Sequence, residues 1–96
     1  MDVIIEFNPS AFKHHIAEAV IRNAFMNALY DDVLDDAANQ DSADKHLLLG
    51  YDRNGTILEI LYNIIDENSI NVFHAMGCRS IYFPLLDDYW RTMWHE

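Results

Sequence analysis

The sequence predicts an α+β fold in which helices pack on one face of an antiparallel sheet. Between residues 16 and 29 the apolar side chains recur at spacings of three and four, which is the period of an amphipathic helix. From residue 45 to residue 79 they alternate instead, and two short polar turns divide this stretch into three apolar runs. That pattern is typical of an antiparallel meander. One sheet and a few helices therefore account for most of the chain.

The elements before the meander are expected in the order strand, helix, helix. Residues 3–7 form a short apolar run that fits an edge strand. The Asn-Pro-Ser of residues 8–10 predicts the start of a short helix, because Asn or Ser caps a helix and Pro is tolerated in its first turn. The apolar face that begins at Ile16 predicts a longer helix that fades through the aspartates from residue 31 onward. A polar loop at residues 39–44 follows.

Within the meander, the Asn-Gly pair at residues 54–55 is a strong hairpin signal, because both residue types can adopt positive φ. Residues 66–69 form the second turn. The strand at 56–65 is expected to bury mainly one face, with Glu59 on the other. Pro84 is expected to close the extended tail of the third strand and to start a C-terminal helix. The predicted architecture is an N-terminal strand and two helices on a sheet of three to four antiparallel strands, followed by that helix.

The length of 96 residues indicates a single domain, residues 1–96. A composition with 51% hydrophobic residues and only two prolines is typical of a compact fold. No run approaches the roughly 20 apolar residues of a spanning helix, and the N-terminus lacks the basic segment of a signal peptide. We therefore expect a cytoplasmic protein with no membrane contact. The one cysteine, Cys78, cannot form an internal disulfide. No spacing such as His-x-x-x-His is present, so neither a metal nor a cofactor is expected.

The charge balance bears on the kind of partner. The chain carries 16 acidic and 6 basic residues, a net charge of −10. This balance argues against nonspecific binding of nucleic acid, since phosphates are normally contacted by Lys and Arg, and it favours a basic partner. Residues 31–44 concentrate six aspartates without any Lys or Arg. They form either a solvated helix end and loop or a docking face for a basic protein.

Several motifs occur in an informative order. Asn-Pro-Ser-Ala-Phe-Lys-His precedes a hydrophobic helix and is followed by Lys-His-Leu-Leu-Leu-Gly-Tyr, Asn-Gly, a Leu-Glu-Ile strand, and Val-Phe-His-Ala-Met with an Arg downstream. Over residues 3–86 this order resembles the BrnT-like toxins of bacterial type II toxin–antitoxin systems. The resemblance implies a RelE-like fold, a ribonuclease acting on messenger RNA, and neutralisation by a cognate antitoxin.

The resemblance also implies which residues form the catalytic site. Carried over position by position, they are Lys13, His14, His74 and Arg79. The match is incomplete, because Met76 stands where many of these toxins have an arginine.

The chemistry of RNA cleavage without a metal needs three groups. A base takes the 2′-hydroxyl proton, an acid protonates the leaving 5′-oxygen, and a cation holds the phosphate. His74 with Lys13 or His14 fits the acid–base pair, and Arg79 fits the phosphate clamp. Each also has a structural interpretation: a strand histidine bonded to its neighbours, a solvated helix face, or an arginine paired with an aspartate.

Lys45 and His46 are predicted to bind substrate. They start the first strand of the meander, whereas His74 lies in the third. We expect His46 and His74 near one end of the sheet, with Arg79 just beyond them.

Two functions from different classes remain open. The first is an RNA-cleaving toxin, with RNA and a cognate antitoxin as its partners. The second is a non-catalytic protein on the same fold, whose acidic segment binds a basic protein. A homodimer or a hetero-oligomer is compatible with either function, because so short a chain buries only a small core.

Overall fold

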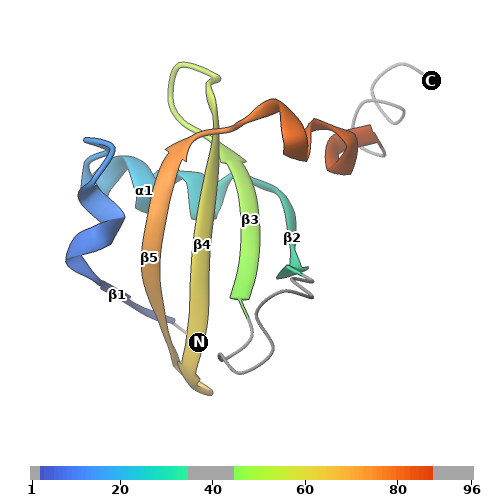
Figure 1. The fold of residues 1–96 in the computed structure, drawn as a ribbon. Coiled ribbons are helices and arrows are strands. Elements are labelled where there is room, and N and C mark those ends of the chain that lie inside the picture. Colours follow the sequence, from blue (N-terminus) through green and yellow to red (C-terminus); the bar gives the residue numbers. More distant parts are fainter. Residues whose placement is uncertain (1–2, 35–44, 88–96) are drawn as a thin grey trace.

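The computed structural model describes residues 3–34 and 45–87. Their elements run in the order β1 (Ile4–Phe7), the 3₁₀ helix η1 (Pro9–Phe12), α1 (Glu18–Met26), β2 (Ala28–Leu34), β3 (Lys45–Tyr51), β4 (Ile57–Asp66), β5 (Ser69–Gly77) and the 3₁₀ helix η2 (Ser80–Leu86). The five strands form one sheet in the order β1-β5-β4-β3-β2 (Figure 1). β1 pairs with β5 in parallel and the other neighbours are antiparallel. The predicted α+β class is confirmed, whereas the prediction of a purely antiparallel sheet is wrong.

The meander of β3, β4 and β5 is confirmed, and carboxylates organise both of its turns. In the first turn, Asp52 accepts hydrogen bonds from the backbone N–H groups of Asn54 and Thr56 at 2.8 and 2.9 Å. Gly55 takes the positive φ, 82°, and Asn54 does not. Asp66 organises the second turn by accepting hydrogen bonds from the backbone N–H of Asn68 and from the hydroxyl of Ser69. These local bonds fix the two reversals that place β4 in the middle of the sheet.

β2 stands where the sequence predicted the end of a helix. α1 ends at Met26, and residues 28–34 then pair with β3. The hydroxyl of Tyr62 in β4 donates a 2.6 Å hydrogen bond to Asp31, which ties β2 to the middle of the sheet. Pairing with β3 thus overrides the helical spacing of the apolar side chains. The rest of the acidic segment, residues 35–44, lies outside the described residues.

Both faces of the sheet are covered. η1 and α1 pack on one face, and the buried side chains between them and the sheet are Ala11, Ile21, Ala24, Leu48, Leu58, Ile60, Tyr62, Val72 and Ala75. η2 covers part of the other face around Leu47, Leu49 and Leu86. The prediction that β4 buries mainly one face is confirmed, because Leu58, Ile60 and Tyr62 are all buried on the α1 side. On the η2 side, Glu59 is the one fully buried residue of β4, with 0% exposure.

α1 approaches β3 closely at Gly50. A Cβ atom at this position would overlap the carbonyl oxygen of Ala24 and lie 3.0 Å from its carbonyl carbon. Only glycine, which has no side chain, allows the backbone of the helix to approach the strand this closely. The contact places Ile21, which is also fully buried, against the sheet.

The chain leaves the sheet at the end of β5. β5 stops at Gly77, and η2 follows with Pro84 inside it. The predicted extended tail up to Pro84 is therefore wrong, because η2 turns back so that Leu86 reaches the second core. The predicted C-terminal helix falls mainly beyond residue 87, outside the described residues. Within residues 3–34 and 45–87, no helix combines the length and apolarity needed to cross a bilayer.

Candidate functional site

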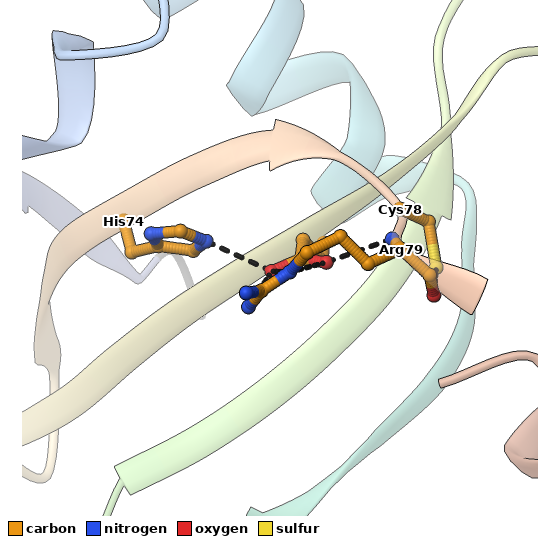
Figure 2. A network of polar contacts seen from close by, with 4 residues as sticks. His74, Cys78 and Arg79 are labelled. Carbon is orange, nitrogen blue, oxygen red and sulfur yellow. Dashed lines mark hydrogen bonds and ion pairs between the residues drawn. The ribbon is translucent and has the colours of Figure 1, made fainter. Parts of the chain in front are cut away.

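The site is built around one buried carboxylate, that of Glu59 in β4. Its Oε1 accepts hydrogen bonds from the backbone N–H of Arg79 at 2.9 Å and from Nε of the same residue at 3.0 Å. Its Oε2 accepts from Nη2 of Arg79 at 2.7 Å and lies 2.9 Å from Nε2 of His74. Glu59 thus joins His74 on β5 to Arg79 just beyond that strand, and Figure 2 labels both of these partners and marks the contacts of the network with dashed lines. These bonds offset the large cost of burying a charge.

Arg79 therefore pairs with an acid, although the acid is a glutamate and not one of the aspartates. The pair is bidentate, which fixes the plane of the guanidinium. The arginine side chain nevertheless remains 49% exposed, and the ring of Tyr82 lies 5.7 Å from its Cζ. The cluster thus presents an oriented and half-exposed cation.

A β-bulge aims His74 at Glu59. Residues 61–62 of β4 pair with His74 and Val72 of β5, so Phe73 has no partner in the ladder. One extra residue reverses the alternation of side chains between the two faces. Val72 before the bulge faces α1, and His74 after it faces the η2 side. In a regular strand, His74 would share the face of Val72 and point away from Glu59.

His14 joins the cluster from the N-terminal segment. Its ring meets that of His74 edge-on, with centroids 5.5 Å apart and ring planes at 75°. η1 holds the segment in place, since the hydroxyl of Ser10 donates a 2.7 Å hydrogen bond to the carbonyl of Phe73. His14 is exposed and the His74 side chain is 20% exposed, so solutes can reach the histidine pair.

The electrostatics of the cluster fix its protonation pattern. Burial by itself would raise the pKa of Glu59, but the hydrogen bonds from Arg79 and His74 and the charge of Arg79 outweigh it and lower this pKa below its usual 4.5. Glu59 is therefore ionised at neutral pH and can only accept hydrogen bonds, so His74 carries a proton on Nε2. In the neutral ring, Nδ1 is then the proton acceptor.

Acid is expected to weaken the fold through Glu59. Because its pKa is lower in the folded chain than in the unfolded chain, this carboxylate contributes stability above about pH 4.5. The contribution is lost as the pH falls through the lowered folded pKa. Urea denaturation across this range should show a steeper loss of unfolding free energy for the wild type than for Glu59→Gln. Glu6→Gln, an exposed residue of β1, should keep the wild-type slope, and equal slopes for the wild type and Glu59→Gln would contradict the ionised pair.

The other predicted site residues lie elsewhere. His46 stacks on Tyr62, with ring centroids 5.0 Å apart, on the face that α1 covers. His74 faces the opposite side, so His46 and His74 do not form a cluster, because alternation along β3 and the bulge in β5 send them to different faces. Lys45 begins β3, two strands from β5. Lys13 is exposed at the end of η1, next to His14 in the chain.

Cys78 does not have the character of a nucleophile. Burial raises the pKa of its thiol, and the charge of Glu59 raises it further, against the opposing effect of Arg79. A raised pKa disfavours the reactive thiolate. Among the residues that the structure describes, no three His, Cys, Asp or Glu side chains are grouped so that they could hold a metal ion.

Glu59 is the site residue that the sequence analysis missed. The sequence feature that could have revealed it is a carboxylate inside the apolar run Leu-Glu-Ile. The neighbouring strand carries His74 and is followed by Arg79. A charge in such a run needs a cationic partner if the strand is buried on both faces.

Fold and site together define a small α+β protein with a reachable histidine pair that rests on a buried Glu–Arg pair. Comparisons of the chain with protein-family models, with curated proteins and with solved structures found no match. The BrnT-like and RelE-like assignments stay predictions, and the function is argued from the geometry of the cluster.

Proposed function

We propose that the protein is a ribonuclease that cleaves RNA without a metal, at the cluster of His14, His74, Glu59 and Arg79. The observation that supports this most is the pair of adjacent imidazoles, one of which is held by a buried carboxylate beside a half-exposed arginine. Acid–base side chains oriented by buried polar partners are typical of catalytic sites.

The proposed reaction is an internal transesterification. Nδ1 of His74 takes the proton of the 2′-hydroxyl, whose oxygen attacks the phosphorus. The bond from phosphorus to the 5′-oxygen breaks, and protonated His14 gives its proton to that oxygen. Glu59 holds the tautomer and orientation of His74, while the exposed part of Arg79 donates to a non-bridging oxygen. The products are a 2′,3′-cyclic phosphate and a 5′-hydroxyl, and Lys13 adds positive charge beside His14.

The biological setting that we propose is that of a RelE-like toxin in a type II toxin–antitoxin pair, found in the cytoplasm. The order of motifs supports it, as does a sheet whose third meander strand carries His74 beside an N-terminal segment carrying His14. In this setting an antitoxin encoded by an adjacent gene binds the chain and stops cleavage. Expression of the chain alone then arrests growth, and co-expression of that gene relieves the arrest.

The purified wild type is expected to cut single-stranded RNA in the presence of EDTA and to leave 2′,3′-cyclic phosphate ends, identified by mass spectrometry. Loss of a general acid or base typically costs about 10²–10⁴-fold in rate, so His14→Gln and His74→Gln should each slow cleavage by at least about 100-fold. Glutamine is chosen at His74 because its amide can still donate to Glu59. Arg79 is a poor probe of the chemistry, since it also neutralises Glu59.

The matched control is His15→Asn. His15 is exposed and has a φ of 66°, a conformation that asparagine tolerates. This variant should cut at the wild-type rate. A folded wild type that cuts no RNA would overturn the ribonuclease proposal, and so would His14 and His74 variants that cut as fast as the wild type.

The second candidate function is the non-catalytic binding of a basic protein. The pairing of Arg79 with Glu59 favours it, because the two charges cancel and weaken the attraction of the cluster for phosphate. This function predicts salt-sensitive binding of a basic protein and no RNA turnover by the purified chain. If the wild type cleaves RNA and His14→Gln does not, this second function is contradicted.

A further inference from the structure

The outer edge of β5 changes its partner at the bulge. β1 pairs with β5 only as far as Phe7 opposite Val72, one residue before Phe73. Within the described residues no strand lines this edge further on, and the carbonyl of Phe73 accepts its hydrogen bond from the Ser10 hydroxyl at 2.7 Å. Since backbone carbonyls need partners, a side chain takes over where the neighbouring strand ends.

η1 is built to hold this hydroxyl. The side chain of Asn8 accepts the N–H of Ser10 at 3.0 Å, and the N–H of Asn8 donates to the carbonyl of Val72 at 2.8 Å. On the other side of Ser10, Ala11 is fully buried in the core. Ser10 is therefore anchored on both sides, and its bond to Phe73 joins segments 63 positions apart.

The bulge decides which way His74 points. If β5 shifted its register by one residue to absorb Phe73, His74 would change faces and leave Glu59. The chain that follows η1 brings His14 to the ring of His74. We propose that Ser10 is a positioning residue, which through the bulge at Phe73 orients His74 toward Glu59 and sets its distance from His14. The catalytic consequence rests on the proposed function, whereas the orientation of His74 does not.

The test compares three variants by NMR. Ser10→Ala removes the hydroxyl, Ser10→Thr keeps one, and Ser80→Ala removes the hydroxyl of an exposed serine in η2. Long-range ¹H–¹⁵N spectra of the imidazoles, recorded at a pH where the ring is found to be neutral, report the tautomer of His74. The wild type, Ser10→Thr and Ser80→Ala are expected to show one tautomer, protonated on Nε2. Ser10→Ala is expected to show a mixture, with altered amide shifts at residues 73–75.

Cleavage kinetics supply the second measurement. Ser10→Ala is expected to lower kcat about tenfold or more with little change in KM, because misplaced acid–base groups slow the chemical step. If Ser10→Ala gives the same His74 spectrum as the wild type, the positioning role is overturned. It is also overturned if Ser10→Thr alters the spectrum as much as Ser10→Ala does. An altered spectrum that is specific to Ser10→Ala, in a protein that cuts no RNA, supports the positioning role and contradicts the ribonuclease.

Discussion

Arg79→Met is expected to lower the free energy of unfolding by about 3 kcal/mol. The substitution removes the cation that pairs with Glu59, whose carboxylate stays buried and keeps only the bonds from His74 and from the backbone N–H of residue 79. Breaking a buried ion pair costs about 3–5 kcal/mol, and we expect the lower end because solvent already screens a half-exposed arginine. Urea denaturation at neutral pH measures the change.

Removing both charges should restore most of this loss. Replacing a buried ion pair by apolar groups is often neutral, so the double variant Glu59→Leu with Arg79→Met is expected within about 1 kcal/mol of the wild type. Arg53→Met, in the exposed first turn of the meander, is the control for losing an arginine and should change stability by less than about 0.5 kcal/mol. If the double variant proved as unstable as Arg79→Met, the unpaired carboxylate of Glu59 would not be the cause of the lost stability.

Gly50→Ala is expected to cost about 3 kcal/mol or more, at or above the usual range for overpacking. The added methyl would overlap the carbonyl oxygen of Ala24 and lie 3.0 and 3.3 Å from its carbonyl carbon and Cα. All three are backbone atoms of α1, so no side-chain rotation relieves the overlap. The helix must lift from β3 and loosen the contacts of Ile21, which thermal unfolding would report as a lower Tm.

Gly77→Ala is the matched control for Gly50→Ala. A Cβ atom at Gly77 meets nothing within 4 Å. Alanine there restricts the unfolded chain, so stability should stay the same or rise by up to about 1 kcal/mol. If Gly50→Ala proved as well tolerated as Gly77→Ala, α1 could not lie against β3 as the structure places it.

The parts of the fold that could be predicted are those with local signals. The meander follows from alternating side chains and from turn residues such as Asp52 and Gly55, whose bonds lie within the turn itself. β2 has no comparable signal, because residues 16–29 continue one helical spacing past the point where α1 ends. The strand conformation of β2 depends on its pairing with β3, which lies further along the chain. The periodicity of apolar residues in one segment does not reveal such a pairing.

Part of the candidate site could be predicted from the sequence, but neither the role of Glu59 nor the geometry of the cluster could. His14, His74 and Arg79 follow from the resemblance and from the scarcity of basic residues. Their arrangement depends on the bulge at Phe73, which leaves no mark in the composition of β5. The burial of Glu59 likewise depends on the second covered face, which η2 and Arg79 create only in the folded chain.

The distance along the chain between the two histidines determines when the cluster can assemble. The Glu59–Arg79 contact joins residues 20 positions apart, whereas the Ser10–Phe73 bond spans 63. Ribosomes synthesise roughly 5–20 residues per second from the N-terminus, so η1 emerges several seconds before the strand on which it docks. During translation the nascent chain therefore carries His14 without its partner, and the cluster of His14 and His74 cannot form until β5 has left the exit tunnel.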